Sequence, residues 1–220
     1  MKFLTYHLIP NSIDVLRAGI VVLDRSLLRG EFLYHHRLGA RAYLANLLPK
    51  HGVGAELGVF TGLFSTILLG TARPEKAYFI DPWWKEYGSQ YPDWGSYTDH
   101  GRLSTTVAHR VASERIQRCA HETKVEVLVE YATTFLSKVP DNHFDWIYLD
   151  STHSYEGTRA ELLALRNKAK SGAVIAGDDW QNDPAHPHAG VAKAVREAVE
   201  RREYESLMTL PALQWMIRVR

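Results

Sequence analysis

The feature that most constrains the fold is a short apolar run that leads through a glycine-containing turn into a second apolar run. Val53 to Leu57 predicts a buried strand, Gly58 to Gly62 predicts a turn, and Leu63 to Leu69 predicts a helix. A strand that enters a helix through a tight turn is the repeating unit of parallel α/β sheets. The chain is therefore expected to build a parallel sheet covered by helices.

Four further apolar runs of strand length support this interpretation. They are Ala77 to Ile80, Val125 to Val129, Phe144 to Leu149 and Gly172 to Ala176. A helical pattern over Glu156 to Lys170 separates the last two runs. Strands that alternate with helices predict five parallel strands in one sheet.

The C-terminal part changes character. Val191 to Arg202 predicts a helix, and Ser206 to Leu210 and Gln214 to Val219 are two short apolar runs separated by Pro211. These runs predict a closing antiparallel hairpin. The predicted class is α/β, with a doubly wound, mostly parallel seven-stranded sheet, and ligands are expected at the carboxyl ends of its parallel strands.

The 220 residues fit one domain, 1–220, in which residues 1–50 form a mainly helical N-terminal preface. Within the preface, Leu33 to Leu48 has apolar residues at helical spacing before Pro49 ends the pattern. This segment could supply a homodimer surface or a cover for a pocket. A homodimer is expected only because proteins of this fold class often form dimers.

Charge and composition favour a small-molecule partner. The 26 Lys and Arg residues nearly balance 25 Asp and Glu residues, so no global field attracts nucleic acid or an anionic membrane. No apolar run approaches the roughly 20 residues that span a bilayer. Cys119 has no second cysteine to pair with, and Met1 to Asn11 lacks the pattern of a signal peptide. A cytoplasmic location is expected.

The turn after the first predicted strand suits a nucleotide-like cofactor. Gly58 allows the backbone to approach a ligand, and free amides at the helix start favour a carboxylate. Glu56 could receive an ammonium group, and Asp81, at the end of the second strand, could accept hydrogen bonds from both hydroxyls of a ribose. The alternative for Gly58 and Gly62 is an ordinary tight turn.

Three carboxylates follow the fourth and fifth predicted strands. Asp150, Asp178 and Asp179 would repel one another if unpaired, so a divalent cation with oxygen ligands, most simply magnesium, explains their grouping. His153 lies three residues beyond Asp150 and is a candidate general base, since an imidazole can take a hydroxyl proton near neutral pH. The alternatives are a helix-capping role for the aspartates and a surface role for His153.

These residues resemble the class I S-adenosylmethionine-dependent methyltransferases, in particular the macrocin O-methyltransferase-like and related small-molecule branch. The resemblance runs from about Gly54 to Val195. It is carried by ELGVFTG at Glu56 to Gly62, FIDPW at Phe79 to Trp83, FDWIYLDSTHSYEG at Phe144 to Gly157, GAVIAGDDW at Gly172 to Trp180, and GVAKAV at Gly190 to Val195. It implies a Rossmann-like methyltransferase fold.

The resemblance also implies roles for individual residues. The implied contacts of S-adenosylmethionine are Glu56, Gly58, Thr61, Gly62, Asp81, Trp83 and Thr133. The implied metal ligands are Asp150, Asp178 and Asp179, and His153 occupies the position of the base, with Asp150 beside it. Two positions depart from the family pattern, because the segment that holds Thr133 lacks the usual glycine and Ser151 is often glycine in relatives.

The predicted function is transfer of a methyl group from S-adenosylmethionine to a hydroxyl of a small molecule, assisted by magnesium and by His153, plausibly in natural-product biosynthesis. Two adjacent oxygens would chelate such an ion, so a sugar diol or a catechol-like ring is the expected acceptor. The aromatic segment Trp83 to His100 is either a substrate lid or a loop packed on the body of the protein. His186 and His188 follow Asp178 and Asp179 on a loop expected over the same pocket and could contact the substrate, but they are expected to be solvated loop residues.

Two other functions stay open. A nicotinamide-dependent oxidoreductase would also have a glycine turn and an acid at a strand end, although the G-x-G-x-x-G fingerprint is absent. A non-catalytic protein that binds S-adenosylmethionine and supports a partner would leave the acidic residues and His153 without a role.

Overall fold

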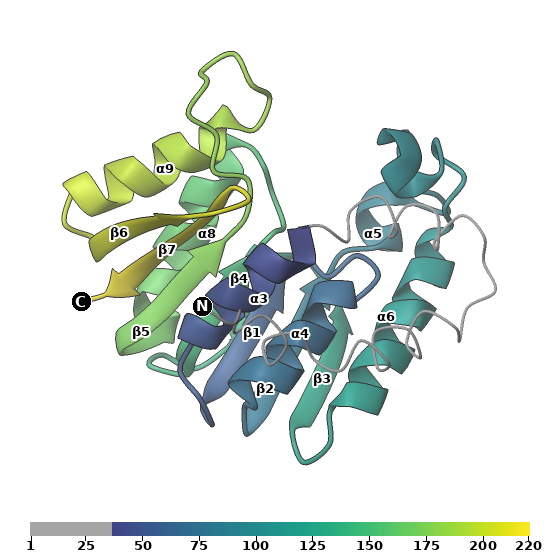
Figure 1. Ribbon diagram of the computed structural model, residues 1–220, viewed down its shortest axis with the longest axis horizontal. Coiled ribbons are helices and arrows are strands. Elements are labelled where there is room, and N and C mark those ends of the chain that lie inside the picture. The colour runs from purple at the N-terminus through teal and green to yellow at the C-terminus, as the bar shows by residue number, and fades with distance from the viewer. Residues whose placement is uncertain (1–36) are drawn as a thin grey trace, which may run out of the picture.

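Seven strands form one mixed sheet in the computed structural model, which describes residues 37–220 (Figure 1). The strands are β1 (Val53–Leu57), β2 (Lys76–Asp81), β3 (Lys124–Val129), β4 (Phe144–Leu149), β5 (Ala169–Gly177), β6 (Tyr204–Leu210) and β7 (Gln214–Val219). Their order is β3-β2-β1-β4-β5-β7-β6. The first five strands are parallel, and β7 runs antiparallel to both β5 and β6. The predicted α/β class and the C-terminal hairpin are confirmed.

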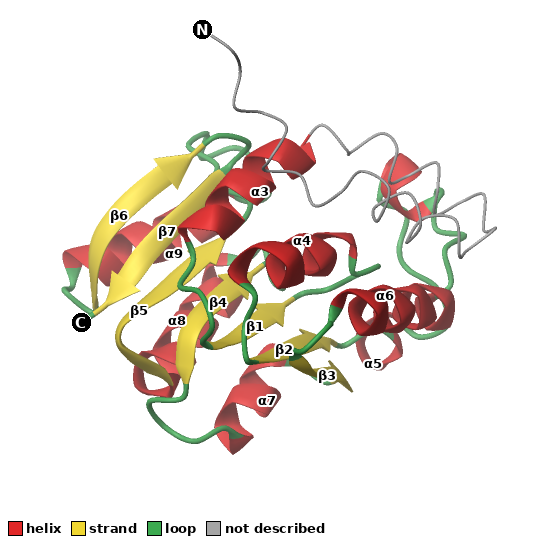
Figure 2. Ribbon diagram, turned by 60° about the horizontal axis from the view of Figure 1, so that its bottom comes forward, coloured by secondary structure: helices red, strands yellow, loops and turns green. Residues whose placement is uncertain are grey.

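Helices cover both faces of the sheet (Figure 2). They are α3 (Leu38–Leu47), α4 (Leu63–Ala72), α5 (Trp84–Tyr87), α6 (Thr105–Cys119), α7 (Ala132–Lys138), α8 (Tyr155–Lys168) and α9 (Ala189–Glu200), with a short 3-10 helix, η3, at Gly95–Thr98. Helices α3, α4 and α6 lie on one face, and α7, α8 and α9 lie on the other. Within residues 37–220, no helix combines the length and apolar character needed to cross a bilayer.

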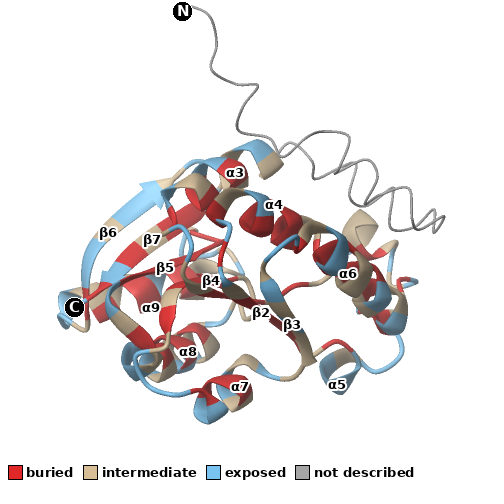
Figure 3. Cartoon of the chain, turned by 90° about the horizontal axis from the view of Figure 1, so that it is seen from below, coloured by how far each residue is buried: buried red, intermediate tan, exposed pale blue. Residues whose placement is uncertain are grey.

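The central strands are apolar on both faces because helices bury both of them. Trp146 and Tyr148 of β4 pack with α3 and α4, while Ile147 between them packs with α8 and α9. Phe144 also packs with α8 and α9, because a register shift between Phe144 and Trp146 interrupts the alternation. All four side chains are fully buried. Figure 3 shows the same distribution, with buried residues concentrated in the middle of the sheet and β6 largely exposed at its edge.

Most observed boundaries of helices and strands agree with those predicted from the sequence, and the differences have physical causes. The predicted helix to Lys170 was too long, because α8 ends at Lys168 and β5 begins at Ala169 to pair with Phe144. Helices α6 and α7 were not predicted, since α6 is mainly polar and buries only one stripe of side chains. Helix α3 confirms Leu38 to Leu47 of the preface, and the remainder of the preface before Arg37 lies outside the described residues.

The carboxyl ends of the parallel strands lie on the same side of the sheet, and the strand order reverses its direction between β1 and β4. From β1 the sheet grows one way toward β2 and β3 and the other way toward β4 and β5. Two backbone hydrogen bonds hold the strand ends, from the amide of Asp150 to the carbonyl oxygen of Leu57 and from the amide of Gly58 to that of Ile80, each 2.8 Å long. Loops that leave this point in opposite directions open a crevice suited to a ligand.

Candidate active site

A cavity of about 890 Å³ lies at the carboxyl ends of the parallel strands. It is lined by residues from the turn after β1, the end of β2, the start of α7, the loops after β4 and β5, and helix α3. Its volume is in the range of pockets that enclose a cofactor or a small molecule. The predicted location of the ligand site therefore agrees with the position of this cavity.

The turn after β1 requires glycine at Gly58. The φ angle of Gly58 is +95°, and a Cβ added there would lie 1.9 Å from the backbone oxygen of Asp150. Gly62, with φ of +72°, allows a different close approach, because its Cβ would lie 2.8 Å from Cα of Ala112 in α6. Gly58 and Thr61 line the cavity, whereas Gly62 packs the turn against α6.

Asp81 holds the glycine turn in place. One of its carboxylate oxygens accepts hydrogen bonds from the amides of Val59 and Phe60, at 3.0 and 2.8 Å, and the other accepts one from the amide of Trp83, at 2.8 Å. Burial raises the pKa of Asp81, and the three backbone donors partly offset that effect. A carboxylate has about four acceptor positions, and backbone amides among the described residues occupy three of those of Asp81, which also lines the cavity.

Glu56 brings a buried carboxyl group to the same cavity. The side chain is 2% exposed, lies in β1 and accepts a hydrogen bond from the hydroxyl of Ser65. Burial raises its pKa to about 8, which means that the empty site favours the neutral acid. A cationic ligand group would supply the missing counter-charge, so this donor set fits an ammonium group.

Trp83 and Thr133 take different positions. Trp83 is fully buried, and its indole nitrogen donates a hydrogen bond of 2.9 Å to the backbone oxygen of Phe60. It does not line the cavity, so its predicted contact with the cofactor is replaced by support of the turn. Thr133, in the first turn of α7, does line the cavity.

Two arginines of α3 supply a positive charge that the sequence analysis did not assign to this site. Arg41 forms ion pairs with both Asp150, at 3.0 Å, and Asp178, and Arg37 pairs with Asp178 at 2.6 Å. The same Asp178 oxygen that contacts Arg37 accepts hydrogen bonds from the amide of Asp179 and from the side chain of Gln214. Both oxygens of Asp178 are thus engaged by protein donors.

The arginines determine the charge state of these acids. Burial would raise the pKa of Asp150, but Arg41 and His153 outweigh it, and the pKa is lowered. Burial raises the pKa of Asp178 to about 6 despite Arg41. The premise that Asp150 and Asp178 lack a counter-charge is wrong, because Arg41 lies between them. The three carboxylates do not fit a shared magnesium ion in this arrangement, since an ion would have to displace Arg41.

His153 lies where the sequence predicted a base. Its Nε2 atom is 3.1 Å from a carboxylate oxygen of Asp179 and 3.7 Å from one of Asp150, and among residues 37–220 this buried atom has no partner in hydrogen-bond geometry. Burial would lower the pKa of His153, but the neighbouring carboxylates, Asp150 first, outweigh it and raise the pKa. The imidazole lines the cavity.

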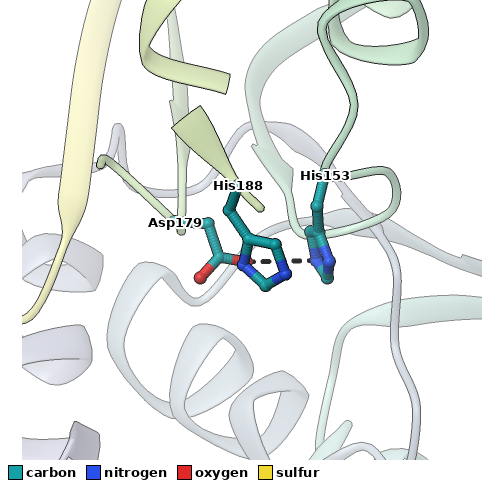
Figure 4. A group of neighbouring side chains, drawn as sticks. All are labelled: His153, Asp179 and His188. Carbon is teal, nitrogen blue, oxygen red and sulfur yellow. Dashed lines mark ion pairs between the residues drawn. The ribbon is translucent and has the colours of Figure 1, made fainter. Parts of the chain in front are cut away.

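His188 joins this group from the loop before α9. Its Nδ1 atom lies 3.3 Å from the same oxygen of Asp179 that His153 contacts, and the two imidazole rings are 4.3 Å apart (Figure 4). The expectation of a solvated loop residue is therefore wrong for His188, and the alternative of a loop residue at the pocket agrees with its position in the cavity wall.

The segment Trp83 to His100 is folded onto the body of the protein and also lines the cavity. Tyr91 is 3% exposed, and the ring of Tyr97 stacks on Phe60 with 4.5 Å between centroids. Tyr87, Tyr91, Trp94 and Tyr97 all reach the cavity. The interpretation of a loop packed on the body agrees with this arrangement, in which the aromatic side chains also form one wall of the site, and a lid role stays a prediction.

Residues 55–180, more than half of the chain, match the model of a family described as a methyltransferase domain. The chain belongs to this methyltransferase family. Together with the fold, this identifies a class I S-adenosylmethionine-dependent methyltransferase, as the resemblance implied. It also removes the oxidoreductase alternative. No curated protein sequence matches the chain.

Solved structures of other proteins, two of them O-methyltransferases, share the fold. An O-methyltransferase from Bacillus cereus in complex with SAH is 16% identical, with a TM-score of 0.59, and the match covers 97% of this chain and 94% of that one. The O-methyltransferase TomG from Streptomyces achromogenes, involved in tomaymycin synthesis and solved with SAM, is 18% identical, with a TM-score of 0.54 and coverage of 96% and 97%. Cofactor-bound Rv0187 from MTB is 17% identical, with a TM-score of 0.57 and coverage of 95% and 88%.

Proposed function

We propose that this methyltransferase acts on a hydroxyl oxygen of a small molecule, a sugar diol or a catechol-like ring, with His153 as the general base. One observation carries the proposal: the buried Nε2 of His153, which has no hydrogen bond within the described part of the chain, belongs to a residue that lines the same cavity as Glu56 and the Gly58 turn. A proton acceptor and a site for the methyl donor thus share one enclosed space. The structural relatives that are O-methyltransferases support the same reaction class.

S-adenosylmethionine occupies the part of the cavity nearest β1 and β2 in this proposal. Glu56 binds the ammonium group of the cofactor. Because Gly58 has no side chain, the cofactor can approach the backbone of the turn. Asp81 retains one acceptor position for a ribose hydroxyl, and Thr133 borders the adenine. Thr61 lines the same wall, while Gly62 and Trp83 act indirectly by fixing the turn.

Glu56→Gln tests the cofactor end of the site. The substitution removes a charged hydrogen-bond partner, so we expect S-adenosylmethionine to bind about 10- to 100-fold more weakly in titration calorimetry at pH 8. Because the folded pKa of Glu56 is raised to about 8, the native state binds more protons than the unfolded state between its ordinary pKa and pH 8. Stability of the ligand-free wild type therefore falls as pH rises through this window.

The same variant should consequently lose this pH dependence and melt at a higher temperature than the wild type at pH 8 without ligand. Thermal unfolding at pH 5, 6, 7 and 8 measures the difference. Equal cofactor affinity in Glu56→Gln and wild type would remove Glu56 from the proposed site, whatever the melting temperatures show.

At the acceptor end, the hydroxyl of the substrate lies within reach of His153. The acceptor oxygen forms a bond to the methyl carbon as the bond from that carbon to sulfur breaks, and Nε2 of His153 takes the hydroxyl proton. Asp179, 3.1 Å from Nε2, stabilises the resulting imidazolium. The cofactor leaves as the neutral thioether, so charge and protons balance without another reactant.

The aromatic wall favours a planar ring or a sugar. The rings of Phe60, Tyr91 and Tyr97 contact one another and leave apolar faces beside the acidic end of the cavity. A panel of catechols, phenols, sugar diols and primary amines, assayed for S-adenosylhomocysteine and for methylated product by mass spectrometry, tests the acceptor class. Methylation confined to amines would overturn the proposed oxygen chemistry, and binding of S-adenosylmethionine without turnover would favour the non-catalytic alternative.

Binding of magnesium by Asp150, Asp178 and Asp179 stays a prediction. An ion at this position would have to displace the side chain of Arg41 from Asp150 and Asp178. Because Arg41 pairs with two of these carboxylates and Arg37 also pairs with Asp178, we propose that methyl transfer proceeds without the ion. Location in the cytoplasm and formation of a homodimer also stay predictions.

Chelation gives a direct measure of magnesium dependence. We expect turnover after treatment with EDTA and gel filtration to be at least about half that of the untreated enzyme, because removal of magnesium changes no counter-charge in the arrangement described. Added Mg²⁺ should restore nothing. A loss of more than about tenfold that millimolar Mg²⁺ reverses would instead support the three-carboxylate metal site.

A further inference from the structure

Two imidazole nitrogens converge on one carboxylate oxygen in the loops after β4 and β5. Nε2 of His153 and Nδ1 of His188 lie 3.1 and 3.3 Å from the same oxygen of Asp179, and the three ligand atoms all lie within 4.8 Å of one another. Figure 4 shows the three side chains turned toward one another from separate segments of the chain. The group is partly enclosed, with side-chain exposures of 42%, 12% and 35% for His153, Asp179 and His188.

These separations are close to those that a bound metal ion imposes. Bonds of about 2.0 to 2.2 Å from zinc to nitrogen and oxygen place neighbouring ligand atoms about 3.3 to 3.6 Å apart in tetrahedral geometry. The separation of 3.3 Å between Asp179 and His188 lies in that range, and the separation of 3.1 Å between Asp179 and His153 is slightly shorter. The two imidazole nitrogens lie within 4.8 Å of each other.

The ligand atoms are also available. Among the described residues, the carboxylate of Asp179 contacts only the two histidines, whereas both oxygens of the adjacent Asp178 are taken by arginines and other donors. Nε2 of His153 is buried and forms no hydrogen bond. Asp179 has a φ of +61°, in the left-handed region that asparagine and aspartate adopt more readily than most other non-glycine residues.

We propose that His153, Asp179 and His188 form a site for a divalent transition-metal ion of the zinc type. Two imidazoles and one carboxylate favour such borderline ions over magnesium, which prefers oxygen ligands. Three protein ligands leave at least one coordination position facing the cavity. The site shares Asp179 with the predicted magnesium ligands but is otherwise distinct, and it needs no movement of Arg41.

This site has a consequence for catalysis that rests on the proposed function. A metal ion bound to Nε2 of His153 occupies the lone pair that would accept the proton from the acceptor hydroxyl. The bound ion therefore inhibits methyl transfer, and an ion that is absent or chelated leaves the base free.

Metal binding is measured first, without cofactor or acceptor. Metal-free full-length protein is titrated with Zn²⁺ by calorimetry and with Co²⁺ by visible absorption, with Mg²⁺ as the comparison ion. We expect one Zn²⁺ per chain, a Co²⁺ spectrum of a four- or five-coordinate site, and no heat with Mg²⁺ at the same concentration. His188→Ala should weaken Zn²⁺ binding at least 30-fold, about 2 kcal/mol at 1.4 kcal/mol per tenfold.

His186→Asn is the matched control, because His186 lies two residues away in the same loop and its Nδ1 only accepts a hydrogen bond from the amide of His188. Asparagine keeps an acceptor there, and Zn²⁺ affinity should stay within about twofold. Absence of Zn²⁺ binding, or equal affinity in His188→Ala and wild type, overturns the site.

The activity measurement follows and separates the two proposals. We expect Zn²⁺ to inhibit wild type and His186→Asn at the concentration that fills the site, and EDTA to reverse the inhibition. The residual activity of His188→Ala should not respond at that concentration. Zn²⁺ that binds with the expected variant pattern but does not inhibit an active enzyme overturns the inhibitory role. Metal-free protein that methylates no acceptor contradicts the proposed function and leaves the metal site standing.

Discussion

His153→Ala is expected to lower the turnover of methyl transfer by about 10²- to 10⁴-fold, the usual contribution of a positioned general base. The substitution removes the proton acceptor that faces the cavity and leaves Glu56 and the glycine turn untouched. The affinity for S-adenosylmethionine, measured by calorimetry, should therefore stay within about threefold of wild type. Turnover equal to that of the wild type would exclude His153 as the base.

The acidity of the acceptor distinguishes a base from a merely structural residue. A nitrocatechol has a hydroxyl that is already ionised near neutral pH and needs no base, whereas an unsubstituted catechol does. We expect the loss caused by His153→Ala to shrink by at least tenfold with the acidic acceptor, and added imidazole to restore part of the turnover with the other. An equal loss with both acceptors would show that the substitution disturbs the site rather than removing a proton acceptor.

The fold could be predicted because its signals are local. The buried strands are short apolar runs that end at glycine or aspartate, as in Phe144 to Leu149, and the glycine turn at Gly58 lies directly after one of them. Helix α6 was not predicted because its buried residues, among them Ala108, Val111 and Ile116, are small or widely spaced among charges. Its position against Gly62 depends on contacts distant in sequence.

The acids and His153 of the candidate site could also be predicted, since each follows a predicted strand and parallel strands bring their ends together. Arg41 could not, because its partners Asp150 and Asp178 lie 109 and 137 residues away and no local pattern links them. The same limit applies to Trp83. It ends the FIDPW motif, but only the packed structure shows that its side chain points into the core rather than the cavity.

Arg41 also explains why acids that gather at strand ends need not signal a metal. Three carboxylates in a partly buried space require a counter-charge, and sequence alone does not say whether an ion or a side chain supplies it. In this chain α3 supplies it to Asp150 and Asp178, which leaves Asp179 to the two histidines. The need for a counter-charge was predicted correctly, but the residue that supplies it lies in the N-terminal segment, far from these acids in sequence.

Gly58→Ala is expected to have the largest effect on cofactor binding. The new methyl carbon would lie 1.9 Å from the backbone oxygen of Asp150, so β1 and β4 must separate or the turn must move. Strain from the φ of +95° and overpacking together should destabilise the protein by about 2 to 5 kcal/mol. Because the amides of the turn and the Asp150 backbone both shift, affinity for S-adenosylmethionine should fall at least about 100-fold in folded protein.

Gly172→Ala provides the matched control because it separates backbone strain from close approach. Gly172 has a similar φ of +79°, but an added Cβ would meet no atom within 4 Å. It should cost only the strain of about 1 to 2 kcal/mol and leave cofactor affinity unchanged. Both variants are compared by urea unfolding and by calorimetry below their melting temperatures. If Gly172→Ala lowered stability and cofactor affinity as much as Gly58→Ala does, backbone strain alone would explain the loss of affinity. The close contact between Gly58 and the backbone of Asp150 would then have no specific role in cofactor binding.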